Sequence, residues 1–278
     1  MTISRERFNA LQAKWGAHSS WAVWKLAGPD ETPKAHIGDR SILNPDTNME
    51  LLDVLNPAIV MVGLNASSRE GNGEAWGNFH DGDSKANDFK LRFAFEGTWL
   101  WGAYMTDALV NFPETDSAKV LAYTKANPDE VAQQLDRFEE ELRDLGSSNP
   151  LVIVFGGGAY SLLRRRLGDK YWLVKVTHYS AYINKVTLRA DVIRAVAEAT
   201  SANQIPSDAL PGELQLNAPV SKKQFYEARC RNEQCDFAGG MVDVTIDYRT
   251  PYETGYSWTC PNCGTKISTE YSFPPRVD

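Results

Sequence analysis

The chain lacks any hydrophobic run long enough to cross a membrane, since none of its stretches approaches the ~18 consecutive apolar residues that a span needs. The N-terminal sequence MTISRERFNALQ also lacks the apolar centre of a secretory signal. These absences argue against a membrane partner. We therefore expect a cytoplasmic protein.

An excess of positive charge is also missing, because the formal net charge of the 278 residues is -7. A nucleic-acid partner would then need a local basic surface. Residues 160–194 hold eight Lys and Arg against two Asp, whereas residues 127–145 hold seven acidic residues against two Arg. Either both segments are solvated helix faces of opposite sign, or the basic segment forms a local basic surface.

Two families of catalytic motif are absent. No Gly-x-Ser-x-Gly elbow occurs, which gives nucleophilic hydrolysis by serine little support. Gly156-Gly157-Gly158 follows an apolar run, but the third glycine of a dinucleotide fingerprint is missing. We therefore expect no organic cofactor.

Cysteine is scarce, and all four cysteines lie after residue 229, as Cys230-x4-Cys235 and Cys260-x2-Cys263. In a cytosolic chain, two such close pairs favour tetrahedral zinc over disulfides. The segment resembles a zinc ribbon holding one structural zinc ion, and four thiolates leave no open position for catalysis. The ribbon's partner is either DNA or a protein, and ten acidic against seven basic residues from position 201 onward weaken the case for DNA.

The rest of the chain alternates apolar runs with helical patterns. Residues 59–62, 151–155 and 172–176 are continuously apolar or nearly so, which is typical of parallel strands buried on both faces. Helical spacing of apolar residues follows Pro128 and recurs over residues 188–199. The pattern predicts a three-layer α/β/α sandwich with a short, mainly parallel central sheet. We expect this domain over residues 1–200, a linker over 201–222, and the zinc ribbon over 223–278.

Polar residues cluster where the predicted strands end. The first run leads into Gly63-Leu64-Asn65-Ala66-Ser67, and Phe79 follows fourteen residues after Asn65. Tyr104-Met105-Thr106-Asp107 ends in a carboxylate, and Thr177-His178-Tyr179-Ser180 follows the third run. Ligands of open α/β sheets bind beyond the carboxyl ends of the strands, where Asn65 and His178 both lie, so these two residues are candidates for one site.

Taken together, these motifs resemble the uracil-DNA glycosylase superfamily, especially its mismatch-specific branch, whose first motif reads Gly-Ile-Asn-Pro-Gly and whose last reads His-Pro-Ser or Asn-Pro-Ser. The resemblance covers about residues 55 to 200, and the order of the motifs agrees. Ala66 and Tyr179 stand where the family has proline. Without these prolines, the two loops are expected to be less rigid.

The resemblance implies a role for each matching residue. Asn65 would fix a water beneath the sugar C1′, and His178 would donate a hydrogen bond to the pyrimidine O2 as negative charge grows there. Phe79 would stack on the extruded base. The wedge that enters the vacated stack would be Tyr182 or Ile183. The further residues that the resemblance assigns to base or DNA binding are Gly63, Leu64, Ser67, Asp107, Ser180 and Lys185. Structural roles for Phe79 in the core and for His178 as a satisfied histidine remain open.

Two positions bear on the base. Ser67 stands where narrow uracil enzymes have a tyrosine that blocks C5, so its small side chain leaves room there. Asp107 stands at the base-reading position, where uracil enzymes use asparagine. An ionised carboxylate only accepts hydrogen bonds and prefers the exocyclic amine of cytosine. This predicts a DNA glycosylase for a C5-modified cytosine, and excision of such bases from viral DNA would be an antiviral defence.

Three alternatives stay open. Asp107 can serve as a helix cap or a structural acceptor. The enzyme can be an ordinary uracil or mismatch glycosylase of base-excision repair. The chain can also be a non-catalytic module that recognises DNA or a protein.

Overall fold

The computed structural model describes residues 3–28, 30–66, 74–201, 222–230, 232, 234–235, 238–249 and 254–271. The chain divides into two compact units, one of residues 1–27 and 32–214 and the other of residues 28–31 and 215–278. Each unit has a β-sheet of its own. The predicted linker lies almost entirely outside the described residues.

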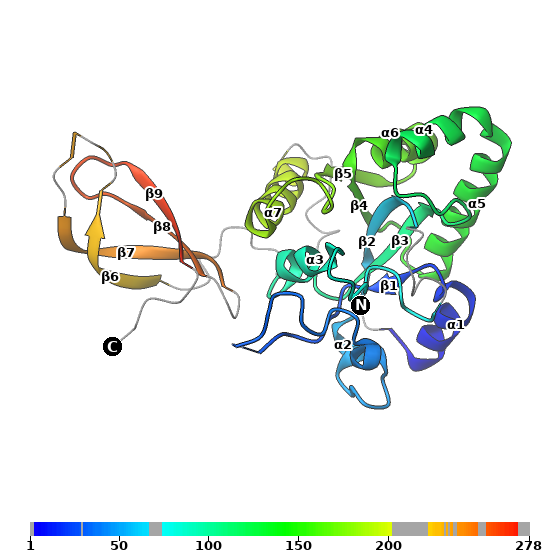
Figure 1. Cartoon of the computed structure of the whole chain (residues 1–278), viewed down its shortest axis with the longest axis horizontal. Coiled ribbons are helices and arrows are strands. Elements are labelled where there is room, and N and C mark those ends of the chain that lie inside the picture. The colour runs from blue at the N-terminus through cyan, green and yellow to red at the C-terminus, as the bar shows by residue number, and fades with distance from the viewer. Residues whose placement is uncertain are drawn as a thin grey trace. The chain divides into compact units, whose positions relative to one another are not determined.

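The first unit is built on a five-stranded sheet in the order β1-β3-β2-β4-β5 (Figure 1). Its strands are β1 (Ser20–Trp21), β2 (Asn56–Asn65), β3 (Ala103–Leu109), β4 (Leu151–Phe155) and β5 (Trp172–Val176). β1 pairs antiparallel with β3, whereas the other neighbours are parallel. The prediction of a mixed α/β fold with a mainly parallel central sheet is confirmed, and the three predicted runs are β2, β4 and β5.

Seven α-helices and one short 3-10 helix accompany this sheet in the described residues. They are α1 (Arg5–Trp15), η1 (Arg40–Leu43), α2 (Leu51–Val54), α3 (Asp88–Phe95), α4 (Ser117–Ala126), α5 (Pro128–Asp144), α6 (Gly156–Leu167) and α7 (Lys185–Ser201). The two helices predicted from apolar spacing are α5 and α7. Nothing among the described helices combines the length and the apolar character of a membrane span.

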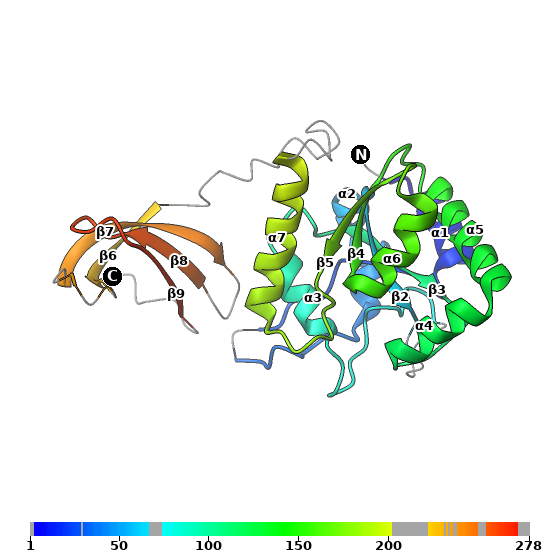
Figure 2. The same ribbon diagram turned by 90° about the horizontal axis from the view of Figure 1, so that it is seen from above.

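Two hydrophobic cores cover the two faces of the sheet. On one face, alternate strand residues such as Val60 and Val152 pack with buried residues of α1, α5 and α6. On the other face, Met61 and Ile153 pack with buried residues of α3 and α7. Figure 2 shows α3 and α7 on one side of the strands and α5 and α6 on the other. Burial on both faces explains the continuously apolar strands.

The register of the parallel strands brings the predicted site residues to one edge. Gly63 on β2 pairs with Asp107 on β3, and Asn65 pairs with Leu109. β5 ends at Val176, two residues before His178. The carboxyl ends of β2, β3 and β5 therefore carry these groups to the same edge of the sheet.

The acidic and basic segments are not two separately solvated faces. Arg166 on α6 forms ion pairs with Asp136 and Glu139 on α5, and Lys170 Nζ lies 2.6 Å from a carboxylate oxygen of Glu139. Arg189 is buried and donates to main-chain carbonyls at the end of α3. The local positive charge counted from the sequence is therefore partly neutralised. Exposed basic residues that remain in this segment include Arg164, Arg165 and Lys175.

A buried polar network lies between α5 and the sheet. The Glu141 carboxylate is fully buried, accepts from Arg137 Nη1 at 2.6 Å, and accepts from the Tyr104 hydroxyl at 2.7 Å. Arg137 Nη2 donates at 2.7 Å to the main-chain oxygen of Asp107. Burial raises the pKa of Glu141, and Arg137 opposes this rise. The network therefore ties α5 to β3 beside Asp107.

The second unit is a four-stranded antiparallel sheet in the order β6-β7-β8-β9 (Figure 1). Its strands are β6 (Lys222–Arg229), β7 (Ala238–Arg249), β8 (Thr254–Thr259) and β9 (Lys266–Tyr271). Residues 241–246, in which apolar and polar residues alternate, lie within β7. The loops after β6 and after β8 each carry one cysteine pair.

Removing one partner of a buried ion pair leaves the other charge uncompensated, which typically costs about 3 to 5 kcal/mol. We predict that Arg137→Met lowers the free energy of unfolding by about 3 kcal/mol, as measured by urea denaturation near neutral pH. Arg143→Met is the matched control, because Arg143 lies exposed on the same helix. The control should change stability by less than about 0.5 kcal/mol. Equal effects of the two substitutions would contradict the buried network.

Candidate functional site

A cavity of about 600 Å³ lies at the carboxyl edge of the first sheet. Its walls include Asn65, Phe79, Asp107 and His178, which come from four separate segments of the chain. Further lining residues are Leu64, Asn78, Asp81, Asp88, Gly156, Gly158, Tyr179 and Ser180. The structure therefore brings together the predicted catalytic pair and three of the predicted base-binding residues, Leu64, Phe79 and Asp107.

Gly63 lies beneath this group. A Cβ atom at Gly63 would stand 2.1 Å from Asp107 Oδ1 and 3.7 Å from Phe79 Cζ. The first distance is far below van der Waals contact, so a side chain at this position would displace the carboxylate. Glycine at the end of β2 therefore lets the carboxylate and the aromatic ring lie over the strand.

Asp107 is a buried carboxyl group whose partner is an amide. Its side chain is 3% exposed, and Asn78 Nδ2 donates to Oδ2 at 2.8 Å. Burial raises the pKa of Asp107 from 3.8 to about 7, although the bond from Asn78 opposes this rise. Arg137 contacts the main-chain oxygen of Asp107 and also lowers its pKa. The carboxyl group is thus poised between its neutral and ionised forms near neutral pH.

Phe79 has an unusual backbone conformation. Its φ is 61°, in the left-handed region that L side chains rarely adopt. The Trp24 indole donates to Phe79 O at 3.1 Å, and Phe79 N donates to the Asn78 side chain at 3.1 Å. The ring is 4% exposed and is part of the core, while it also lines the cavity. Backbone strain held in place beside a cavity is typical of functional sites.

His178 is held as a neutral hydrogen-bond donor. The main-chain N–H of Ser180 donates to His178 Nδ1 at 3.1 Å, which leaves the ring proton on Nε2. The Ser180 hydroxyl lies 2.7 Å from the same nitrogen. Burial lowers the pKa of His178 from 6.5 to about 4. At neutral pH the ring therefore offers an N–H from Nε2.

The Asn65 side chain, at the end of β2, is held in place by hydrogen bonds from its amide nitrogen. Nδ2 donates to the main-chain oxygens of Glu114 at 2.7 Å and Phe112 at 3.1 Å. It also lies 3.1 Å from the oxygen of Ala66. Because three carbonyl oxygens surround Nδ2, the orientation of the amide is fixed. Asn65 lines the cavity, and its Oδ1 is left as a hydrogen-bond acceptor.

The two loops that lack proline are held by other contacts. The Tyr179 ring stacks on His178 at 4.6 Å between ring centroids and packs against Phe155 at 5.5 Å. Lys90 Nζ on α3 lies 3.2 Å from Tyr179 O and 3.3 Å from Ala181 O. The bonds from Asn65 tie the other loop to residues 112–114.

The remaining predicted residues have different surroundings. Of the two residues predicted as a wedge, Tyr182 is fully exposed, whereas Ile183 is partly buried against the core. Lys185 Nζ lies 4.5 Å from the centroid of the Phe93 ring. Ser180 is exposed but directs its polar atoms to His178. Ser67 lies outside the described residues.

Several cavity residues were not predicted from the sequence. Asn78 immediately precedes Phe79, and its contact with Asp107 joins positions 29 residues apart, which no local pattern indicates. Asp81 and Asp88 add two carboxylates to the walls. The sequence marks Tyr179 only as the replacement of a proline, although its ring contacts His178 and Phe79 and forms part of the cavity wall.

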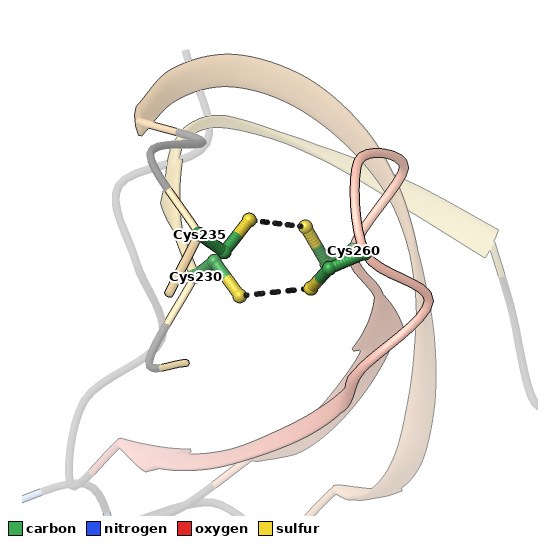
Figure 3. Close-up of side chains that lie close together, drawn as sticks. Cys230, Cys235 and Cys260 are labelled. Carbon is green, nitrogen blue, oxygen red and sulfur yellow. Dashed lines mark hydrogen bonds between the residues drawn. The ribbon is translucent and has the colours of Figure 1, made fainter. Parts of the chain in front are cut away.

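The second unit contains a cluster of four cysteines. The Sγ atoms of Cys230, Cys235, Cys260 and Cys263 lie within 4.8 Å of one another. Figure 3 shows Cys230 and Cys235 facing Cys260 from the opposite loop. Tetrahedral zinc with bonds of about 2.3 Å places sulfurs roughly 3.8 Å apart, and two of the distances here are 3.6 Å. The four sulfurs could hold one metal ion.

The β8–β9 loop has the turn that a closed thiolate site needs. Gly264 has a φ of 71° and donates its N–H to Cys260 O at 2.9 Å. Asn232 N lies 3.5 Å from Cys230 Sγ in the other loop. The neighbouring Thr265 hydroxyl lowers the pKa of Cys263 to about 6, which favours the thiolate that binds metal.

Comparison of the chain with known proteins finds no matching family model, no matching curated protein and no matching solved structure.

Asp107 should make stability depend on pH. The unfolded carboxyl ionises above its ordinary pKa of 3.8, whereas the folded one keeps its proton until about pH 7. The folded state therefore loses stability as the pH rises through this window. We predict that Asp107→Asn raises the free energy of unfolding by about 3 kcal/mol more at pH 8 than at pH 4. Urea denaturation of both proteins at the two pH values measures this difference.

Asp53→Asn, which changes an exposed carboxylate on α2, is the control for this comparison. If Asp107→Asn changes stability equally at both pH values, the carboxyl group is not held neutral by burial.

Proposed function

We propose that the first unit is a DNA glycosylase, which extrudes a nucleotide from DNA and hydrolyses the bond between deoxyribose C1′ and the base. The observation that supports this most is the shared cavity lined by Asn65, Phe79, Asp107 and His178. These residues come from separate segments, and the resemblance to the uracil-DNA glycosylase superfamily assigns each a complementary role. The cavity lies where open α/β sheets bind ligands.

In the proposed reaction the C1′–N bond breaks and its electron pair stays with the base. The His178 Nε2–H donates to the pyrimidine O2, where negative charge grows. A preorganised donor of this kind is worth roughly 3 to 4 kcal/mol in the transition state. Burial keeps His178 neutral, and Nδ1 accepts a hydrogen bond from Ser180 N, so the single ring proton is on Nε2 and can be donated to the base.

Water completes the reaction at C1′. Asn65 Oδ1 accepts a hydrogen bond from this water and holds it beneath the sugar, while the water oxygen forms the new bond and its proton passes to solvent. An amide is a poor general base, so Asn65 contributes through orientation. The bonds from its Nδ2 to residues 112–114 fix that orientation before the substrate binds.

Extrusion of the nucleotide requires a group that fills its place in the stack. Tyr182 is fully exposed in the loop that follows His178, so its ring is available to enter the duplex. The extruded base stacks on Phe79, whose ring is held by the core. Basic residues of α6 and β5, such as Arg165 and Lys175, are exposed and would contact phosphates.

The best-supported base is a C5-modified cytosine. Asp107 offers an acceptor for the exocyclic amine when ionised. A volume of about 600 Å³ falls in the range of roughly 300 to 1,000 Å³ that holds drug-sized ligands, which is more than a bare pyrimidine needs. Asp81 and Asp88 supply further acceptors for polar groups on a C5 substituent. Excision of such bases from viral DNA would serve as an antiviral defence.

A uracil or mismatch glycosylase of base-excision repair is the second candidate. Asp107 favours it when protonated, because a neutral carboxyl group has the donor and acceptor of an asparagine amide. Duplexes that carry plain cytosine, uracil, a thymine mismatch or bulky C5-modified cytosines, followed by cleavage of abasic sites, separate the two candidates. Excision of uracil alone would remove the modified-cytosine proposal.

Substitution of the catalytic pair tests whether the unit is an enzyme. We predict that His178→Ala lowers the single-turnover excision rate by about 10²- to 10³-fold, and that Asn65→Ala lowers it by a similar factor. Binding of the same duplex, measured by fluorescence anisotropy, should persist in both variants. Asn48→Ala is the control, because Asn48 donates to Ile42 O in a part of the chain that does not line the cavity.

Wild-type activity in both variants would contradict the proposed roles. An intact protein that binds duplex but excises none of the bases would favour the non-catalytic alternative.

We propose further that the cysteine cluster holds one structural zinc ion and that the second unit is a zinc ribbon. Four thiolates satisfy tetrahedral zinc completely, so the ion stabilises the fold and leaves no open position for water. The two hairpin loops place one cysteine pair each around the same point. The partner of the ribbon is DNA or another protein.

Metal analysis of the purified chain should give one zinc per molecule. Cys260→Ser should lose the metal, and the second unit should then become sensitive to proteolysis, because binding of structural zinc contributes roughly 10 to 16 kcal/mol in zinc-finger peptides. Ser257→Ala is a control in the same unit, since Ser257 is not among the clustered residues. Full zinc content in Cys260→Ser would contradict the site.

A further inference from the structure

The Asn78 amide has no freedom to rotate. Its Nδ2 donates to His18 O at 2.7 Å and to Asp107 Oδ2 at 2.8 Å, while its Oδ1 accepts from Phe79 N at 3.1 Å. A rotated amide would place its oxygen against two acceptors and its nitrogen against a donor. Asn78 can therefore only donate to Asp107 and cannot accept a proton from it.

This arrangement makes the two oxygens of Asp107 unequal. A proton on Oδ2 would meet the N–H of Asn78, so the neutral form carries its proton on Oδ1. Oδ1 lies over Gly63, so close that a Cβ atom at Gly63 would stand only 2.1 Å from it. Asp107 also lines the cavity. Within the described part of the chain, no hydrogen-bond donor is found at Oδ1. Oδ1 is therefore the oxygen of Asp107 that is left to contact a ligand.

We propose that Asn78 is a specificity-determining residue, because it leaves Oδ1 as the one atom of Asp107 that contacts the exocyclic group of the base. When ionised, Oδ1 accepts from the exocyclic amine of cytosine. When protonated, Oδ1 donates to the exocyclic carbonyl of uracil or thymine. This inference rests on the proposed function and adds to it a choice of base that one proton controls.

Burial, more than the surrounding charges, places this choice near neutral pH. Asp88 on α3 and Glu141 on α5 raise the pKa of Asp107, and Arg137 on α5 lowers it. Burial is the largest cause and brings the pKa to about 7. Across the cavity, burial keeps His178 neutral well below that pH, so His178 does not change its charge in the same range. On the segment that carries Asn78, the carboxylate that also lines the cavity is that of Asp81.

The test compares two bases that share the same C5 substituent and differ in their hydrogen-bonding groups at ring positions 3 and 4. Single-turnover excision rates are measured for matched duplexes carrying 5-hydroxymethylcytosine or 5-hydroxymethyluracil, between about pH 5.5 and 8.5. The ratio of the cytosine rate to the uracil rate should rise by about tenfold or more with pH, with a midpoint near the Asp107 pKa of about 7. In Asp107→Asn the ratio should not depend on pH.

Asn78 variants decide whether the amide controls the proton. Asn78→Leu should move the midpoint upward by about one pH unit, because the ionised carboxyl group loses a donor. Asn78→Ser is the second variant if the leucine is not accommodated. Asn48→Leu, which removes an amide that does not line the cavity, should keep the wild-type midpoint. A wild-type ratio that is independent of pH, or an unchanged midpoint in both Asn78 variants, would overturn the inference.

Infrared titration of the free protein separates this inference from the proposed function. The carboxyl stretching band that disappears in Asp107→Asn reports the proton on Asp107 directly. Its midpoint should rise in the Asn78 variants, even if the protein excises neither base and the proposed function fails. Equal midpoints in the wild type and the Asn78 variants would overturn the role of Asn78.

Discussion

The absence of a side chain at Gly63 is the constraint on which the whole cavity depends. Parallel pairing of β2 with β3 sets Gly63 opposite Asp107. The carboxylate then occupies the space that a Cβ atom would take, and the Phe79 ring lies beside it. Any larger residue would push the carboxyl group away from its bond with Asn78, so the polar edge of the cavity follows from one glycine at a strand end.

Burial has opposite effects on the two titratable groups that face this cavity. It raises the pKa of Asp107 to about 7 and lowers that of His178 to about 4. Since burial disfavours the charged form of each group, both favour their neutral forms. Groups whose pKa values are displaced by their surroundings are typical of catalytic sites, where they take distinct acid, base or donor roles. Here the shifted pKa values leave His178 a hydrogen-bond donor throughout the neutral pH range, whereas Asp107 is a donor only when it is protonated.

The sequence predicted the parallel sheet, because strands buried on both faces are continuously apolar, and helices such as α5 repeat apolar residues at helical spacing. It also placed Asn65 and His178 together at the carboxyl ends of the strands, whereas Phe79 and Asp107 joined them only through a family resemblance. The contact between Asn78 and Asp107 escaped prediction, because it depends on the path of a loop and not on local spacing. The pairing of α5 acids with α6 bases escaped it for the same reason, since charge counts along a chain do not say which helices pack together.

The most direct measurement is a crystal structure of the protein with a duplex that contains one C5-modified cytidine whose sugar carries a 2′-fluorine to slow cleavage. The account predicts an extruded nucleotide with its base on Phe79, its exocyclic amine within hydrogen-bond distance of Asp107 Oδ1, and its O2 within reach of His178 Nε2. A nucleotide that remains stacked in the duplex, or a base bound elsewhere with the cavity empty, would contradict the account.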